Sequence, residues 1–307
     1  MVHLSSSWQS PHGRTLPAPG RRTLVMGILN VTPDSFSDGG QLATEAAILK
    51  RAGTLLEQGA DVLDIGGEST RPGAVAVSET EEKARVVPAI RALRAQWPEV
   101  PLSIDTFKPG VAAAAVEAGV DIVNDVWGLT GGWESAVRRA AIAALSEGSG
   151  VALPASPMAT LVAKLRCPVI AMHNRPDREY GDFWEDVLAD LRLSLAVAAE
   201  AGIPKEQLWL DPGFGFAKSP AQNLEVLKRL ERVVALGHPV LVGTSRKSTL
   251  GRVLGTDVDD RLEGTAATMA WAIGRGCAMI RVHDVKVMKR MAVMTDAIKA
   301  GIEWQGA

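Results

Sequence analysis

Three polar side chains follow short apolar runs in this sequence, and together they could recognise a planar heterocycle. Asp105 ends LSID, Asn124 ends IVN and Asp211 ends LWLD. A carboxylate accepts two parallel N–H bonds, and a carboxamide donates as well as accepts. The set therefore suits the amino-pyrimidinone edge of a pterin or guanine. Any one of these residues alone would more simply cap a following helix, so the hypothesis requires that the three converge.

Basic residues form a second group, and their chemistry suits an anion. Lys247 lies in the segment SRKS at a predicted helix start, where backbone N–H groups and the helix dipole favour negative charge. Arg281 and His283 stand two residues apart on the last apolar run and so share one face. Beside Asn30 of the first run, they would suit a pyrophosphate. The alternatives are a solvated Lys247 and a structural His283 that is partnered by Asp284.

A repeated unit predicts the elements that position these groups: an apolar run stops on polar residues and a helical pattern follows. We expect eight strands, over residues 23–30, 62–68, 102–106, 122–126, 168–173, 207–211, 239–244 and 279–283. They are rich in Val, Ile and Leu without clean alternation, which is typical of parallel strands buried on both faces. Glycines give regular helix stop signals at Gly59, Gly119, Gly202, Gly237 and Gly276. The pattern predicts an α/β fold, a (β/α)8 TIM barrel whose chemistry lies at the C-terminal ends of the strands.

One barrel accounts for residues 23–307 as a single domain. Residues 1–22 are rich in Ser, Pro and Gly, and we expect a flexible N-terminal arm. The elongated linker between strands 4 and 5, residues 127–166, is too long for one helix and its loops. We expect two helices around a Gly, Ser and Pro-rich turn, and favour a surface elaboration over a functional lid.

Composition and charge exclude several classes of protein. Lys and Arg number 33 against 35 acidic residues, so no overall field draws the chain to nucleic acid or to an anionic membrane. No apolar run approaches the roughly 20 residues needed to span a bilayer, and we expect a soluble, cytoplasmic protein. Cys167 and Cys277 begin strands that are not neighbours in an eight-stranded ring. They are predicted to be two buried free thiols.

Two Gly-rich polar loops follow adjacent strands: NVTPDSFSDGG at residues 30–40 and GGESTRPG at residues 66–73. Each alone would be ordinary turn chemistry, but at neighbouring strand ends they resemble paired lids. The sequence has no GxxxxGK[ST] loop and no Cys/His cluster with zinc spacing. Any metal is therefore expected to be Mg²⁺, carried mostly by substrate phosphates.

Seven segments in chain order resemble the dihydropteroate synthase family over residues 24 to about 300: NVTPDSFSDGG, GGESTRPG, SIDT, VNDV, DPGFGF, SRKS and RVHDV. The resemblance implies a transferase of folate biosynthesis. In that reaction 4-aminobenzoate displaces pyrophosphate from 6-hydroxymethyl-7,8-dihydropterin pyrophosphate and gives 7,8-dihydropteroate. It also implies Mg²⁺, a homodimer, and inhibition by sulfonamides, which mimic 4-aminobenzoate.

The resemblance further implies a role for individual residues. The pterin would be held by Asp105, Asn124, Met172, Asp211, Phe216 and Lys247. Pyrophosphate would be bound by Asn30, Arg281 and His283, with Asn30 also binding the metal. The surroundings of 4-aminobenzoate would be Phe36, Asp38, Thr70, Arg71, Pro72 and Ser248. The catalytic residues would be Lys247, Arg281 and Asp105. The chain departs from the family pattern at Asn174 and Arg175, where a second Met is common.

Two alternatives share parts of this pattern. A methyltetrahydrofolate-dependent methyl transfer domain has the same barrel and pterin-binding residues, but it would not need SRKS or the TRPG loop. A non-catalytic pterin-binding relative would have lost chemistry, whereas the loops and the pair Arg281 and His283 are intact here. A turnover assay separates these possibilities.

Overall fold

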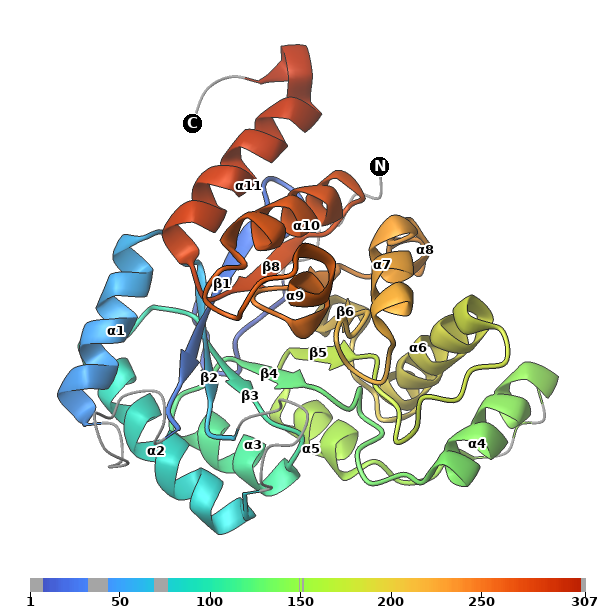
Figure 1. Ribbon diagram of the computed structural model, residues 1–307. Helices are drawn as coiled ribbons and strands as arrows, with labels where there is room; N and C mark the ends of the chain where they lie inside the picture. The colour runs from blue at the N-terminus through green and yellow to red at the C-terminus, as the bar shows by residue number, and fades with distance from the viewer. Residues whose placement is uncertain (1–7, 33–43, 69–76, 149, 151, 305–307) are drawn as a thin grey trace.

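The computed structural model describes residues 8–32, 44–68, 77–148, 150, 152–304 and shows a ring of parallel strands inside a layer of helices (Figure 1). The strands are β1 (Leu24–Asn30), β2 (Val62–Gly66), β3 (Leu102–Asp105), β4 (Ile122–Asp125), β5 (Val169–Met172), β6 (Leu208–Asp211), β7 (Leu241–Val242) and β8 (Met279–Val282). Their order in the sheet is β6-β5-β4-β3-β2-β1-β8-β7. A parallel bridge between Leu210 and Val240 joins β6 to the start of the β7 run. The predicted barrel is confirmed, although β7 is much shorter than expected.

Helices follow the strands in the predicted alternation. They are α1 (Glu45–Glu57), α2 (Glu79–Gln96), α3 (Pro109–Glu117), α4 (Ser135–Glu147), α5 (Pro157–Leu165), α6 (Phe183–Glu200), α7 (Pro220–Lys228), α8 (Glu231–Val234), α9 (Ser248–Leu254), α10 (Leu262–Gly274) and α11 (Val285–Ala300). The five predicted stop glycines all have positive φ, between 79° and 118°, a conformation that glycine adopts without steric cost. The linker between β4 and β5 forms two helices, α4 and α5, as predicted.

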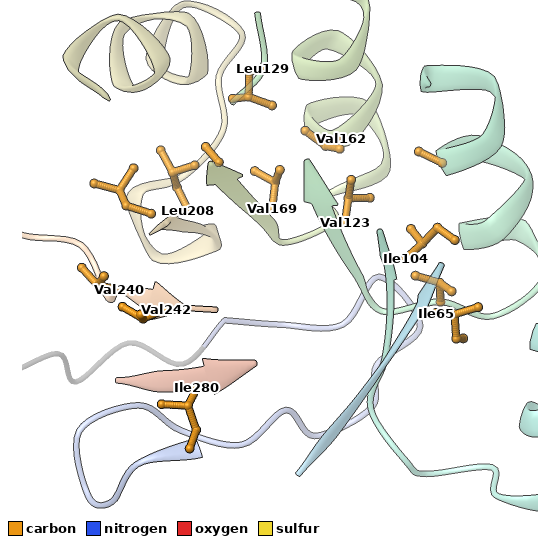
Figure 2. Packing of buried hydrophobic residues seen from close by; sticks show 14 of the residues in the cluster. Ile65, Ile104, Val123, Leu129, Val162, Val169, Leu208, Val240, Val242 and Ile280 are labelled. Atoms are coloured by element: carbon orange, nitrogen blue, oxygen red, sulfur yellow. The ribbon is translucent and has the colours of Figure 1, made fainter. Parts of the chain in front are cut away.

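Alternation along the strands divides the core into two layers. Side chains such as Ile65, Ile104 and Val123 point outward and pack beneath the helices (Figure 2). Inward side chains near the N-terminal ends of the strands fill the barrel floor: Leu24, Met26, Val62, Ile122, Ile170, Trp209, Leu241 and Met279. A sealed apolar floor leaves only the opposite end of the barrel interior for polar chemistry.

The described part of the N-terminal segment, residues 8–22, contacts the barrel through several side chains. Trp8 is 2% exposed, and its ring stacks on Trp209 with centroids 4.4 Å apart. Ser10 donates to Asp121 at 2.5 Å, and Arg14 pairs with the same carboxylate at 2.8 Å. The segment therefore closes the bottom of the barrel. Ser, Pro and Gly content predicted the lack of regular structure but not these distant contacts.

Two smaller predictions are also tested by the fold. Cys167 and Cys277 are free and buried, as expected. Among the described helices, none is long and apolar enough to cross a membrane.

Candidate active site

Strand register places three of the predicted polar residues in one row near the C-terminal ends of the strands. Asn30 lies beside Gly66, Gly66 beside Asp105, and Asp105 beside Asn124, across four adjacent strands. On the other side of the mouth, Met172 pairs with Asp211. Gly66 faces Asn30, and a Cβ at Gly66 would stand 3.1 Å from the Asn30 carboxamide oxygen. Glycine thus leaves room for the amide. The structure places Asp105, Asn124 and Asp211 at the C-terminal ends of β3, β4 and β6, at the same end of the barrel.

The three residues do not cap helices. The residues at the N-termini of α3, α4 and α7 are Lys108, Glu134 and Ser219. The simpler alternative is therefore wrong for this set, and the buried polar groups of the mouth need another explanation.

Arg281 joins the last strand to the second and third. Its Nε donates to Asp64 Oδ2 at 2.6 Å, and its Nη2 donates to Asp105 Oδ2 at 2.7 Å. Burial raises the pKa of Asp105 to about 7. The positive charge of Arg281 opposes this rise, and the negative charge of the nearby Asp64 adds to it. The second oxygen, Asp105 Oδ1, is buried and has no hydrogen-bond partner among the described residues. It is an acceptor that a planar ring with N–H donors could satisfy.

Asp211 begins a tight turn that shapes one wall of the mouth. Its Oδ1 accepts the backbone N–H of Gly213 at 2.7 Å, and Gly213 has φ +68°. A Cβ at Gly213 would meet the His173 carbonyl oxygen at 1.9 Å, so only glycine fits the turn. Burial raises the pKa of Asp211, while the charge on Lys247 opposes that rise. The turn places Phe216 beside Lys247.

Lys247 is held against this turn and is not a solvated surface lysine. Its Nζ donates to the Phe214 carbonyl oxygen and lies 4.5 Å from the centre of the Phe216 ring. A Cβ on Gly215 would stand 2.7 Å from Lys247 Cδ. The absence of a side chain at Gly215 therefore leaves room for the Lys247 side chain to lie against the backbone. Burial, partly offset by Asp211, lowers the pKa of Lys247 to about 8. Ser248 follows as the first residue of α9 and is exposed at the rim.

His283 has a different partner from the one considered in the sequence. Its Nδ1 lies 3.0 Å from Ser245 Oγ. Asp284 instead receives two hydrogen bonds from Arg246, at 3.0 and 2.7 Å. The structure thus gives His283 a partner in Ser245, and gives Asp284 a partner in Arg246.

A buried group behind the mouth was missed by sequence reasoning. Lys218 Nζ lies 2.7 Å from His173 Nδ1 and donates to the carbonyl oxygens of Gly213 and Phe216 at 3.1 and 3.2 Å. The other ring nitrogen, Nε2, is 3.1 Å from Asp190 Oδ2. Burial, followed by the Lys218 charge, lowers the pKa of His173 to about 4, so the ring is neutral and donates to Asp190. The available sequence signal was Lys218 directly after DPGFGFA.

Asn174 and Arg175, where the chain departs from the family pattern, make contacts in this same region. Arg175 Nε donates to Asp190 at 2.6 Å, and its guanidinium lies 4.5 Å from the Tyr180 ring centre. The Asn174 carbonyl oxygen accepts from Arg138 of α4 at 3.0 Å. The helical linker is thereby tied to the shell behind the mouth.

The residues predicted around 4-aminobenzoate lie mostly outside the described residues. They are Phe36, Asp38, Thr70, Arg71 and Pro72. The flanks of the second loop are described: Lys108 Nζ donates to Glu68, to the Val77 carbonyl oxygen and to Glu82, each at 2.6 Å. One half-buried lysine therefore joins Glu68 and Val77, the described residues on either side of residues 69–76.

The described residues offer few ligands for a metal ion. In the described part of the chain, no group of three or more His, Cys, Asp or Glu side chains could hold a metal ion. Asn30 offers one hard oxygen ligand beside the space left by Gly66. This set fits a cation such as Mg²⁺ whose other ligands are phosphate oxygens and water.

Comparison with known proteins gives the same picture. The family model "Pterin binding enzyme" matches residues 26–283. The dihydropteroate synthase of Bacillus subtilis is 46% identical over 283 residues, which cover 92% of this chain and 91% of that protein. Dihydropteroate synthase of Xanthomonas albilineans, solved with 4-aminobenzoic acid, superposes with a TM-score of 0.82 at 41% identity, covering 96% of this chain and 99% of the other. The Yersinia pestis dihydropteroate synthase, solved as a sulfonamide drug complex, gives a TM-score of 0.77 at 37% identity, over 91% and 94% of the chains.

Proposed function

The chain belongs to the pterin-binding enzyme family, and from that premise we propose how its barrel mouth acts as a dihydropteroate synthase. The enzyme condenses 6-hydroxymethyl-7,8-dihydropterin pyrophosphate with 4-aminobenzoate. The amine nitrogen forms a bond to the exocyclic methylene carbon, the bond from that carbon to the pyrophosphate oxygen breaks, and the amine loses a proton. The products are 7,8-dihydropteroate and pyrophosphate.

The pterin ring occupies the polar mouth above the apolar floor. Asp105, Asn124 and Asp211 form the hydrogen bonds to its amino-pyrimidinone edge, because these side chains come from the C-terminal ends of β3, β4 and β6. Lys247 and Phe216 lie along one side of the ring, and Met172 along another. As pyrophosphate departs, positive charge develops on the pterin. The two carboxylates stabilise that charge in a site whose dipoles are already oriented.

The leaving group is held by Arg281, His283 and Asn30. Of the three, Arg281 binds the pyrophosphate most strongly, because its guanidinium stays charged and can form paired hydrogen bonds with phosphate oxygens. The carboxylates of Asp64 and Asp105 outweigh the effect of burial and raise the pKa of Arg281 further. His283 stands two residues along the same strand face, with its ring oriented by Ser245.

Mg²⁺ is the proposed metal, and Asn30 would hold it together with pyrophosphate oxygens. When bound, the ion would neutralise charge on the leaving group. Ser248 at the rim and the two loops of residues 30–40 and 66–73 are proposed to surround 4-aminobenzoate. The same site would accept sulfonamides.

Two features of the whole molecule belong to this proposal. Exposed apolar side chains on α11 include Val287, Met294 and Ile298, and Trp271 of α10 is 49% exposed. Such exposed apolar surface favours a homodimer through these helices.

The two free buried cysteines suit a reducing compartment, and we propose the cytoplasm.

The observation that supports the function most directly is the group of polar residues at the C-terminal ends of the strands, above an apolar floor. The test is a turnover assay of the purified chain with the pterin pyrophosphate and 4-aminobenzoate, in Mg²⁺. Equimolar dihydropteroate and pyrophosphate are expected. Pterin binding without product would instead support a non-catalytic relative, and transfer of a methyl group from methyltetrahydrofolate would support the alternative enzyme.

A further inference from the structure

A buried carboxylate below the mouth holds two of the proposed site residues at once. Asp64 lies in the middle of β2, faces the barrel interior and is 0% exposed. Sequence reasoning did not single it out, because it is inside an apolar run and not at its end. A buried negative charge is costly unless it is paired and hydrogen-bonded. Its position therefore requires strong partners.

Those partners come from strands on opposite sides of β2. The single oxygen Asp64 Oδ2 accepts from Arg281 Nε at 2.6 Å and from Asn124 Nδ2 at 3.2 Å. Arg281 reaches Asp64 from β8, across β1, and Asn124 reaches it from β4, across β3. Arg281 belongs to the proposed pyrophosphate half of the site and Asn124 to the proposed pterin half. One carboxylate oxygen thus links the two halves.

Arg281 forms ion pairs with two carboxylates, and these differ in where they lie relative to the proposed pterin site. Asp64 holds Nε from below, whereas Asp105 holds Nη2 and also faces the proposed pterin position. A substrate whose N–H groups donate to Asp105 competes with Arg281 for that carboxylate. It does not compete for Asp64. Asp64 is therefore the anchor that can keep the guanidinium in place through the reaction.

We propose that Asp64 is the positioning residue of this site: it fixes Arg281 and Asn124 relative to each other, so that pyrophosphate and the pterin ring are bound in register. The inference rests on the proposed function. It assigns Asp64 no contact with substrate. Its effect is transmitted through the two side chains that it holds.

The test is a double-mutant cycle with Asp64→Asn and Arg281→Lys in the full-length enzyme. Asp64→Asn keeps the shape but removes the charge. We expect kcat/KM for the pterin pyrophosphate to fall about 10- to 100-fold, the range for loss of one charge-assisted hydrogen bond. If Asp64 acts through Arg281, Asp64→Asn lowers kcat/KM much less in the Arg281→Lys background than in the wild type. Equal costs in both backgrounds, or wild-type kinetics of Asp64→Asn, would overturn the proposal.

A matched control separates positioning from stability. Asp121 is also 0% exposed and paired with arginines, Arg14 and Arg94, but it lies at the opposite end of the barrel. Asp121→Asn should lower the melting temperature and leave kcat/KM of the folded enzyme unchanged. If Asp64→Asn does not fold, Asp64→Glu keeps the charge and moves the carboxylate by one methylene. Unchanged kcat/KM in Asp64→Glu would also overturn the proposal.

Binding measurements keep this inference distinct from the proposed function. Calorimetry with inorganic pyrophosphate and Mg²⁺ should show weaker binding to Asp64→Asn than to wild type, by a similar factor. If the wild-type enzyme makes no dihydropteroate, the proposed function fails whatever Asp64 does. If the wild type turns over and Asp64→Asn binds pyrophosphate equally well, only the positioning role fails.

Discussion

The side-chain nitrogen of Lys218 lies 2.7 Å from Nδ1 of His173, in a buried contact between the loop after β6 and the end of β5. The same nitrogen donates to the carbonyl oxygens of Gly213 and Phe216. It thereby supports the turn that carries Asp211 at one end and Phe216 at the other. The neutral His173 ring, held by Asp190, supplies the third acceptor.

Lys218→Met should loosen this turn. The buried acceptors around this nitrogen would lose their donor, at a cost of about 2 kcal/mol or more in unfolding free energy. The KM for the pterin pyrophosphate should rise, because Phe216 and Lys247 rest on the turn. Denaturant unfolding and steady-state kinetics measure both effects. The control is Lys228→Met, at a lysine of α7 whose side chain is 65% exposed, and it should change neither quantity.

The pH dependence of stability gives a further measure of Lys218. Burial lowers its pKa from 10.5 to about 7 in the folded state. Between these values the unfolded chain binds the proton and the folded chain does not, so stability rises with pH. The wild-type unfolding free energy, minus that of Lys218→Met, should therefore increase from pH 7 toward pH 10. A difference that is flat across this range would contradict a buried, depressed Lys218.

Asp211→Asn should preserve the fold and remove most of the activity. The amide oxygen can still accept from Gly213, so the turn remains, but the charge-assisted bonds to the pterin are lost. Turnover should fall roughly 100-fold or more, since each such bond contributes about 1.5–3 kcal/mol. Melting curves and kcat are measured on the same preparation. Wild-type turnover with an unchanged melting temperature would show that Asp211 only stabilises the turn.

Binding of the pterin pyrophosphate should weaken as pH rises through about 8. Burial lowers the pKa of Lys247 to about 8, so its positive charge is lost above that value, and an anionic substrate is held less well. Calorimetric titrations between pH 7 and pH 9.5 follow the change. Lys247→Arg keeps its charge over this range and should bind with no alkaline loss, whatever its affinity at pH 7. The same loss in both proteins would assign it to another group.

Activity should depend on Mg²⁺. EDTA should abolish turnover, and added Mg²⁺ should restore it, because a pyrophosphate leaving group needs more positive charge than the side chains supply. Asn30→Ala should raise the Mg²⁺ concentration required for half-maximal rate. Full activity after exhaustive chelation would mean that Arg281, His283 and Lys247 are sufficient.

Sulfonamide binding should require pyrophosphate and a pterin. If residues 30–40 and 66–73 complete the 4-aminobenzoate site only around bound pyrophosphate, binding is ordered. A sulfonamide is titrated into the free enzyme, then into enzyme saturated with pterin, pyrophosphate and Mg²⁺. Tight binding is expected only in the second titration. Equal affinity in both would rule out ordered assembly and would leave the pterin site as proposed.

The sequence by itself determined the repeating unit of this protein, because strand and helix preferences are local. Val, Ile and Leu runs, helix-stop glycines and polar strand ends were sufficient to predict the barrel and the convergence of Asp105, Asn124 and Asp211. Family resemblance then indicated the reaction. The residues proposed to contact 4-aminobenzoate remain predictions, since most lie outside the described residues.

Only the tertiary structure decided which groups hold one another. Trp8 stacks on Trp209, Arg281 bonds Asp64, and Lys218 contacts His173, across 201, 217 and 45 positions of the chain. Closing the ring brings β1 beside β8, and that closure places Arg281 near a carboxylate on β2. A local pattern carries no information about such pairs, since the distance between two side chains depends on strand register and ring closure. The sequence indicated polar residues at the strand ends, and the fold showed which distant partners hold them.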